Sequence, residues 1–259
     1  MDFSSNGFRV VSKLAENRDL IVFSAIKSEV PYTIKFPKSD LGESLILREA
    51  IVLRLLSLSA NCPKFVDLLN TGPRKSLVLE FIPGFSLEKL PYLGVSHERT
   101  LEALKALVSG VKSIHSVGII HNDIKPENII LNPENGGIHL IDFGHSDYLN
   151  KTYVYKENFI GTPMFLAPEA FLGRYSESSD IYSLGVTAYW LFEFGYPFSS
   201  TNLKELFFEK KHPRIKFSRN ITLDLAELIR RMLNPDPKGR PSLVEIEDYM
   251  NLAIRKKAA

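Results

Sequence analysis

Hydrophobic residues in the first third of the chain recur in the short alternating runs that are typical of β-strands. β-Branched and aromatic residues fill residues 8–36, and two further apolar runs cover residues 65–69 and 77–81. Glu29-Val30-Pro31 interrupts the first region and Pro83-Gly84 follows the last run, as turn-forming residues do. We predict three strands within residues 8–36, two more strands after them, and a break in the chain at residues 83–84.

Helical spacing dominates the rest of the chain. Apolar residues recur at intervals of three and four, which predicts helices at residues 43–57, 96–116, 178–194 and 223–233. Ser242 is a suitable N-cap for a last helix.

Composition adds few constraints. With 44% hydrophobic and 24% charged residues, the 259-residue chain is typical of a globular protein, and its net charge of +2 indicates neither a nucleic-acid nor an anionic membrane partner. Cys62 is the only cysteine, so no intrachain disulfide can form, which fits a reducing compartment. The N-terminus does not resemble a signal peptide, and Gly185 and Glu193 interrupt the apolar stretch at residues 184–194. We therefore expect a cytoplasmic chain without membrane insertion.

A polar cluster between two branched apolar runs is the most informative stretch. Residues 119–131 contain Asp123, Lys125 and Asn128 at short fixed spacing, and Asp142 follows at the end of another apolar run. Carboxylate and amide oxygens suit a hard cation, and a separate carboxylate can orient an incoming hydroxyl. These residue types predict a magnesium–phosphate site.

Three motifs together resemble those of the eukaryotic-type protein kinase family. They are His-x-Asp-x-x-x-x-Asn at residues 121–128, Asp-Phe-Gly at residues 142–144, and Gly161-Thr162-Pro163 leading to Ala167-Pro168-Glu169. The resemblance covers about residues 8–253. It implies one bilobal α+β domain over residues 1–259, with a small antiparallel β-sheet N-lobe with one helix (about 1–82) and a larger, mainly helical C-lobe (about 83–259).

The resemblance implies transfer of the ATP γ-phosphoryl group to a protein hydroxyl, with Mg²⁺ as cofactor. Asp123 would accept the hydroxyl proton, and Lys125 would neutralise charge on the γ-phosphate. Asn128 and Asp142 would bind Mg²⁺. Because Lys125 and the Gly161-Thr162 context are typical of the Ser/Thr type, we expect serine or threonine acceptors.

Nucleotide contacts are implied for the N-lobe and the segment between the lobes. Lys35 would bind the α- and β-phosphates and pair with Glu49, although Glu43 could be offered instead. Ser86 is either a ribose contact or a helix N-cap. The residues implied to surround the adenine are Val22, Thr33, Leu79, Glu80, Ile82 and Ile130.

Four structural contacts are also implied. Thr162 would bridge Asp123 and Lys125, and His121 would be a packed, hydrogen-bonded core residue. Asp180 would anchor the backbone of residues 121–128, the catalytic loop of the family. Arg240 would pair with Glu169.

Two features depart from the family pattern. Ala15, Asn17 and Leu20 stand where the family has the glycines of its phosphate-binding loop, which predicts weaker ATP binding. Asn122 replaces the usual arginine that pairs with a phosphorylated activation segment, here residues 142–169. We therefore expect activity that does not depend on phosphorylation of this segment. The residues that could hold it by packing are Tyr148, Tyr153, Tyr155 and Phe159.

Two other functions fit parts of the sequence. The missing glycines and Asn122 would suit a pseudokinase that acts as a nucleotide-binding or scaffold module. The His-x-Asp-x-x-x-x-Asn motif also occurs in small-molecule phosphotransferases, which lack the set formed by residues 167–169, Asp180 and Arg240. As partners we expect a protein substrate and allow for an activating protein that orders the helix of Glu49.

Overall fold

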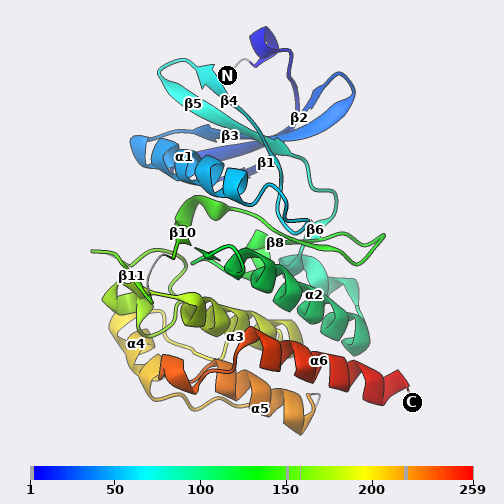
Figure 1. The fold of residues 1–259 in the computed structure, drawn as a ribbon, viewed down its shortest axis with the longest axis vertical. Coiled ribbons are helices and arrows are strands. Elements are labelled where there is room, and N and C mark those ends of the chain that lie inside the picture. Colours follow the sequence, from blue (N-terminus) through cyan, green and yellow to red (C-terminus); the bar gives the residue numbers. More distant parts are fainter. Residues whose placement is uncertain (1–2, 150–151, 158, 219–220, 259) are drawn as a thin grey trace.

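The computed structural model describes residues 3–149, 152–157, 159–218 and 221–258. A β-sheet with one long helix forms the upper lobe in Figure 1, and helices form the larger lower lobe. This architecture confirms the α+β, two-lobed fold that the sequence predicts.

The N-lobe sheet has five antiparallel strands in the order β1-β2-β3-β5-β4. Their bounds are Arg9–Glu16 for β1, Leu20–Lys27 for β2, Val30–Pro37 for β3, Phe65–Thr71 for β4 and Arg74–Glu80 for β5. A short 3₁₀ helix, η1 (Ser4–Asn6), precedes them.

The turn between β2 and β3 is shorter than the sequence predicts. Val30 and Pro31 belong to β3, where they pair with Lys27 and Ile26. The turn consists of Ser28 and Glu29, whose φ angles are 51° and 63°. Positive φ at both central residues is the geometry of a two-residue type I′ hairpin, whose twist matches the flanking strands. Assigning Val30 and Pro31 to the turn was therefore wrong.

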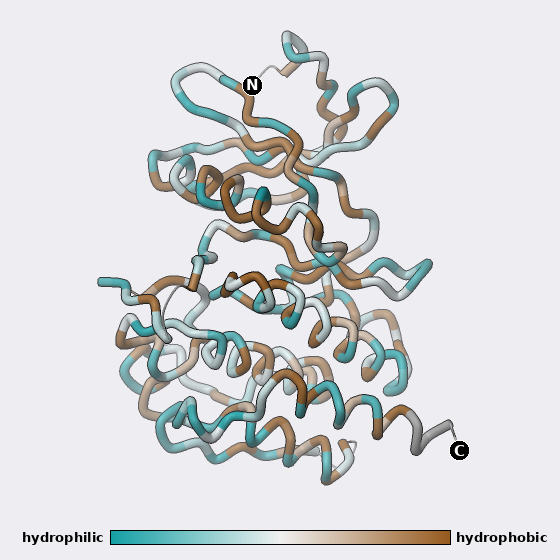
Figure 2. Tube along the Cα trace, in the orientation of Figure 1, coloured by the Kyte–Doolittle hydropathy of each residue, from teal (hydrophilic) through white to brown (hydrophobic). Residues whose placement is uncertain are grey.

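Alternation along the strands gives the sheet two different buried faces. Ile34 and Val78 are cross-strand partners on one face, where the buried Phe3 and Phe8 cover them. Lys35 and Leu77 are partners on the other face. Figure 2 shows hydrophobic residues recurring along these strands, with hydrophilic residues at several outer loops. The second face packs against α1 and borders the space between the lobes.

Helix α1 (Asp40–Leu55) starts three residues before the predicted helix. Ser39 is its N-cap, and the Ser39 hydroxyl accepts a hydrogen bond from the backbone N–H of Gly42 at 3.0 Å. A side chain could not replace Gly42, since a Cβ there would lie 2.2 Å from the carbonyl oxygen of Asp19.

The C-lobe helices follow the predicted periodicity closely. Ser96 and Ser116 flank α2 as its N-cap and C-cap, and Ser242 and Glu245 form a capping pair at the start of the last helix. The helix α4 was not predicted separately. The α-helices are α2 (His97–His115), α3 (Glu177–Glu193), α4 (Leu203–Lys211), α5 (Leu223–Met232) and α6 (Leu243–Ala258).

Short strands and 3₁₀ turns position the polar segments between the lobes. β6 (Phe85–Ser86), β8 (Ile129–Leu131) and β9 (Ile138–Leu140) form a small sheet. Two-stranded ribbons are formed by β7 (Ile119–Ile120) with β10 (Asp147–Tyr148), and by β11 (Val154–Tyr155) with β12 (Arg174–Tyr175). The 3₁₀ helices are η2 (Leu87–Leu93), η3 (Pro126–Asn128), η4 (Phe143–His145), η5 (Ala170–Leu172) and η6 (Pro237–Gly239).

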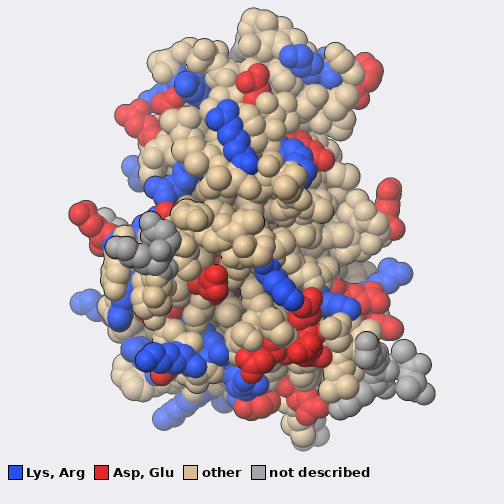
Figure 3. All heavy atoms as spheres, in the orientation of Figure 1, with Lys and Arg blue, Asp and Glu red and all other residues tan. Residues whose placement is uncertain are grey.

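The molecular surface carries charges of both signs. In Figure 3, basic and acidic side chains are interspersed over both lobes. Among the described residues, no helix has the length and apolar character that crossing a bilayer requires.

Candidate functional site

An ion-pair cluster joins the N-lobe sheet, helix α1 and the start of the long loop after β9. The Nζ atom of Lys35 donates to both carboxylate oxygens of Glu49, at 2.9 and 2.7 Å, and to Oδ1 of Asp142 at 3.0 Å. Glu43 instead accepts a hydrogen bond from the backbone N–H of Lys75. Of the two glutamates, Glu49 is therefore the partner of Lys35.

Burial and charge act in opposite directions on this cluster. Burial alone would lower the pKa of Lys35, but the neighbouring charges of Asp142 and Glu49 outweigh burial and raise it. Burial likewise favours a high pKa for Asp142, yet the Lys35 ammonium lowers it to about 2. For Glu49 burial prevails and raises the pKa, although Lys35 opposes this effect. A buried cation held between two carboxylates is stable only while these contacts remain.

A second cluster surrounds Asp123 in the loop between β7 and η3. Its Oδ1 accepts hydrogen bonds from the backbone N–H and the hydroxyl of Thr162, both at 2.9 Å. Its Oδ2 accepts from Nδ2 of Asn128 at 2.9 Å and forms an ion pair with Lys125 at 2.9 Å. Lys125 also donates to the Thr162 hydroxyl at 2.7 Å. The expected bridge from Thr162 to Asp123 and Lys125 is present.

Gly161 lets the activation segment approach this cluster. Its φ is +93°, and a Cβ at this position would lie 2.5 Å from the carbonyl oxygen of Asn122. Any side chain would therefore push Thr162 away from Asp123.

Asp180 of α3 holds the backbone that carries Asp123. Its fully buried carboxylate accepts hydrogen bonds from the backbone N–H groups of His121 at 2.8 Å and Asn122 at 2.9 Å. It also contacts Nε2 of His115 at 2.8 Å, a partner that the sequence did not indicate. The expected anchor of the catalytic loop is present.

His121 and Phe143 pack together beneath the two clusters. Both side chains are fully buried, their ring centroids lie 4.8 Å apart, and the backbone N–H of Phe143 donates to Glu49 at 3.2 Å. His121 also shares a hydrogen bond with the carbonyl of Ile141 at 3.1 Å, so it is a packed core residue as expected. This packing holds Asp142, whose φ of +66° is strained, beside Lys35.

Asn128 and Asp142 are the two candidate metal ligands. Asn128 is held by two hydrogen bonds from its Nδ2, to the carbonyl and to Oδ2 of Asp123, both at 2.9 Å. The Asp142 side chain keeps 37% of its surface exposed. Among the described residues there is no cluster of three or more His, Cys, Asp and Glu. An amide and a carboxylate suit Mg²⁺, which usually takes few protein ligands and completes its shell with phosphate and water oxygens.

The residues proposed for the adenine share one surface of the sheet. Val22 lies opposite Lys35, and Thr33 lies opposite the buried Leu79, so their side chains point to the same face. Ile130 in β8 pairs with Ser86 across the small sheet. Ile82 is partly exposed in the segment that joins the lobes.

Two details restrict the expected contacts in this region. The backbone N–H of Glu80 already donates to the carbonyl of Lys64 at 3.0 Å, so only the Glu80 carbonyl could contact an adenine. Ser86 stands at the N-cap of η2, but its side chain makes no capping hydrogen bond. The contact between the Ser86 hydroxyl and a ribose therefore remains a prediction.

The turn that stands in place of the glycine loop is held by the side chain of Asn17. Oδ1 of Asn17 accepts hydrogen bonds from the backbone N–H groups of Asp19 and Leu20, both at 2.8 Å. Nζ of Lys38 donates to Glu16 at 2.9 Å and to the carbonyl of Asn17 at 2.8 Å. The two Asn17 side-chain contacts use backbone donors that a glycine loop would direct at phosphates.

Aromatic packing, which the sequence suggested, does little to hold the activation segment. Tyr148 and Tyr155 are 59% and 72% exposed. Of the four aromatic residues, only Phe159 has a ring partner among the described residues, Phe171, with centroids 5.6 Å apart. The aromatic hypothesis is therefore wrong for Tyr148 and Tyr155.

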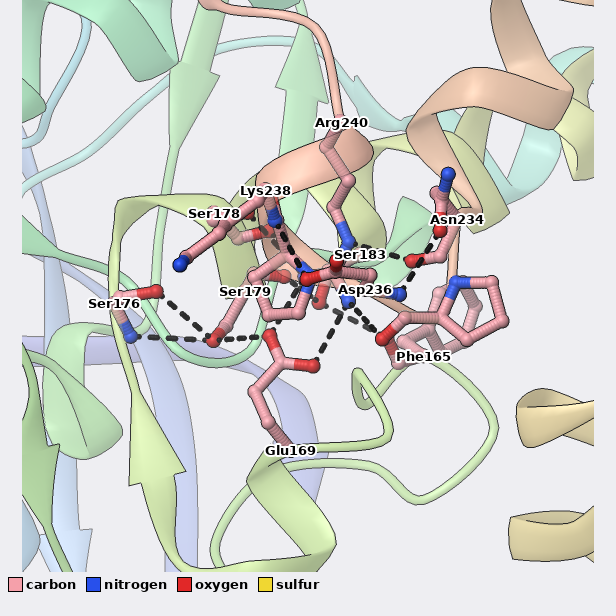
Figure 4. A network of polar contacts seen from close by, with 12 residues as sticks. Phe165, Glu169, Ser176, Ser178, Ser179, Ser183, Asn234, Asp236, Lys238 and Arg240 are labelled. Carbon is pink, nitrogen blue, oxygen red and sulfur yellow. Dashed lines mark hydrogen bonds and ion pairs between the residues drawn. The ribbon is translucent and has the colours of Figure 1, made fainter.

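A buried polar network fixes the end of the activation segment. Figure 4 shows the guanidinium of Arg240 directed at the carboxylate of Glu169, beside Ser178 and Ser179. The two Arg240–Glu169 contacts measure 2.6 and 2.8 Å, and the Ser179 hydroxyl donates to Glu169 at 3.0 Å. The expected pair is present and is bidentate.

Comparison with known proteins agrees with this geometry. The family model described as "Protein kinase domain" matches residues 12–250. The chain is 32% identical over 212 residues to serine/threonine-protein kinase ppk34 of Schizosaccharomyces pombe, which aligns 78% of this chain with 59% of that protein. It is 29% identical over 221 residues to calcium-dependent protein kinase 31 of Arabidopsis thaliana, which aligns 81% of this chain with 46% of that protein.

A third relative aligns with nearly the whole chain. Serine/threonine-protein kinase pakA of Talaromyces marneffei is 28% identical over 253 residues, which are 94% of this chain and 39% of that protein. The chain thus spans roughly half the length of these relatives. Since the family model covers most of the chain and two of these relatives are named serine/threonine-protein kinases, the chain belongs to the eukaryotic-type Ser/Thr protein kinase family.

Proposed function

We propose that this chain is an active protein kinase that transfers the γ-phosphoryl group of ATP to serine or threonine hydroxyls of proteins. The observation that carries the proposal is that Lys35 contacts Glu49 and Asp142 at the same time. A binding module has no chemical need for this alignment, whereas phosphoryl transfer depends on charges placed in advance.

Each charged residue has one role in the proposed reaction. Lys35 orients the α- and β-phosphates, and Asn128 and Asp142 hold Mg²⁺, which neutralises charge on the phosphates when bound. Asp123 orients the acceptor hydroxyl and takes its proton as the new oxygen–phosphorus bond forms. The bond between the γ-phosphorus and the bridging oxygen breaks, and ADP leaves.

Lys125 links the acceptor side to the transferred group. It lies 2.9 Å from Asp123 and 2.7 Å from the Thr162 hydroxyl, so its ammonium can meet the charge on the γ-phosphate next to the attacking oxygen. Val22, Thr33, Leu79 and Ile130 would enclose the adenine, with the backbone of Glu80 and Ile82 at its polar edge. The whole reaction would take place within one domain of residues 1–259, at the residues that lie between the two lobes.

Transfer to protein is tested by incubating the chain with labelled ATP, Mg²⁺ and a mixed protein pool. Label should appear on serine and threonine of the pool, and chelation of Mg²⁺ or the Asp142→Ala change should remove it. The exposed Asp248→Ala is the matched control and should keep activity. If the wild-type chain and Asp142→Ala transfer equally little phosphate, the proposed function is wrong. A pool of small-molecule acceptors, run in parallel, tests the small-molecule phosphotransferase alternative.

Binding without transfer is the second candidate function, and the turn at Asn17 favours it. Two backbone N–H groups that could meet phosphates are bound to the Asn17 side chain instead. A chain with this turn would bind nucleotide weakly and could serve as a scaffold.

The Asn17→Gly change tests how much this turn weakens ATP binding. Freeing the N–H groups of Asp19 and Leu20 should lower the KM for ATP by roughly tenfold, as two added phosphate hydrogen bonds would, with kcat changed by less than about twofold. Initial rates at varied ATP give both constants. Asn135→Gly removes a similar side-chain contact, to the N–H of Gly137, and should leave both unchanged. An unchanged or higher KM for Asn17→Gly would show that the turn does not limit ATP binding.

A further inference from the structure

One carboxylate outside the proposed catalytic residues joins three parts of the molecule. Asp147 lies in β10, next to Ile120 of β7, and its side chain is only 12% exposed. Its Oδ1 accepts from Nη1 of Arg48 at 2.5 Å, and its Oδ2 accepts from Nδ2 of Asn122 at 3.1 Å. The same Oδ2 forms an ion pair with Nζ of Lys156.

Two of these partners are neighbours of catalytic residues. Arg48 precedes Glu49 on α1, and Asn122 precedes Asp123 in the catalytic loop. The Asn122 amide also donates to the carbonyl of His145 at 3.0 Å, while its Oδ1 is buried without a partner in the described structure. The contacts of Nδ2 therefore fix the orientation of this amide.

The third partner ties down the activation segment. The Lys156 side chain is only 16% exposed, and its backbone N–H donates to the carbonyl of Gly173 at 2.9 Å. Gly173 is packed so closely that a Cβ there would lie 2.1 Å from the Lys156 carbonyl. Farther along, the Tyr175 hydroxyl contacts both the N–H and the carbonyl of Ile160. The segment is thus fixed at Lys156 and again just before Thr162.

We infer that Asp147 and Lys156 form a permanent anchor that positions the activation segment in place of a phosphate. The inference rests on the proposed kinase activity and extends it to regulation. The usual arrangement sets a basic residue of the catalytic loop against a phosphate on the segment. Here the carboxylate lies near the start of the segment, in β10 beside the loop of Asn122, and the cation lies farther along the segment, so the charges are reversed.

This reversal explains how Asn122 can stand in place of an arginine. An arginine at that position would place a third cation beside Arg48 and Lys156, and only an added phosphate would offset the repulsion. With Asp147 present, the neutral amide of Asn122 is the third partner of a carboxylate that already contacts Arg48 and Lys156. A phosphate added to the segment near Asp147 would repel it and would not activate the enzyme.

Lys156→Met tests the anchor without touching a proposed catalytic or nucleotide-binding residue. After phosphatase treatment, confirmed by mass, kcat towards a peptide should fall at least about tenfold, as loss of a charge-assisted contact does. The KM for ATP should change by less than about twofold. Lys156→Arg should retain most activity because it keeps the cation. Lys204→Met, at an exposed lysine of α4, is the matched control.

Exchanging the charges of Asp147 and Lys156 tests whether the anchor acts through charge or through packing alone. Asp147→Lys and Lys156→Glu should each lower kcat, since each places like charges together. The double variant restores an ion pair between these two positions, with the charges exchanged. The Asn122 amide can turn its unpaired Oδ1 to the ammonium that Asp147→Lys introduces. The double variant should therefore be at least about tenfold more active than Asp147→Lys alone.

Chymotryptic cleavage after the exposed Tyr155 provides a readout that needs no activity. Cleavage of native protein should be about tenfold faster in Lys156→Met than in wild type or Lys204→Met, because the segment loses its side-chain anchor. The inference would be overturned if Lys156→Met had the cleavage rate and kcat of the wild type. It would also be overturned if the kcat of the double variant were no higher than that of Asp147→Lys. If the wild-type chain transfers no phosphate at all, the proposed function fails, while the cleavage rates still decide whether the anchor exists.

Discussion

Lys35→Met is expected to lower phosphoryl transfer about a thousandfold or more while the fold survives. The Lys35 ammonium contacts both Glu49 and Asp142, and methionine cannot orient phosphates. Initial rates at saturating peptide, together with thermal unfolding, measure the two effects. A folded Lys35→Met protein with near wild-type activity would remove Lys35 from the proposed mechanism.

The glutamates of α1 supply the matched comparison for this prediction. Glu49→Gln should lower kcat strongly and change the melting temperature little, because glutamine keeps the shape and a hydrogen bond to Lys35. Glu43→Gln should be nearly silent, since Glu43 only accepts from the Lys75 backbone at an exposed site. A damaging Glu43→Gln change together with a silent Glu49→Gln change would contradict the role assigned to Glu49, even though Glu49 contacts Lys35 in the structure.

Arg240→Met is expected to destabilise the protein by about 3–5 kcal/mol, the usual cost of leaving one member of a buried ion pair alone. The Arg240 side chain is fully buried, and its loss leaves the carboxylate of Glu169 with the Ser179 hydroxyl as its remaining partner in the network. A loss of this size is a large share of the stability of an ordinary domain. Urea unfolding followed by tryptophan fluorescence gives the free energy.

An exposed ion pair nearby is the control for burial. Arg231 contacts Glu245 at 3.1 Å, but both side chains are about half exposed, at 49% and 55%. Arg231→Met should therefore cost less than about 1 kcal/mol. Equal losses for Arg231→Met and Arg240→Met would show that burial does not set the strength of the Glu169 pair.

Local features of the molecule could be predicted well from the sequence. Helix α2 begins and ends between Ser96 and Ser116 as predicted, because helical spacing and caps depend on residues within one or two turns. The resemblance also implied the Lys35–Glu49 contact and the backbone contacts of Asp180. The catalytic and binding roles of these residues remain predictions.

Contacts that depend on how distant segments pack could not be predicted in the same way. In the sequence, Asp147 and Lys156 are two ordinary charged residues of a long polar loop. Nothing in the sequence indicates that Arg48 contacts Asp147 as well. The hydrogen bonds of the Asn17 turn could not be predicted either. The sequence showed that the glycines are missing, but not that the Asn17 side chain binds two backbone N–H groups.

The sequence by itself determined the two-lobed fold, the order of its elements and the set of charged residues between the lobes. Only the tertiary structure decided which charges meet at Asp147, because the partner of a flexible charged side chain depends on segments far away in the chain. Arg48, Asn122 and Lys156 are brought to Asp147 when the sheet lobe, the catalytic loop and the activation segment pack together. Burial then strengthens contacts that would be weak in water, so packing selects the few ion pairs that hold the site.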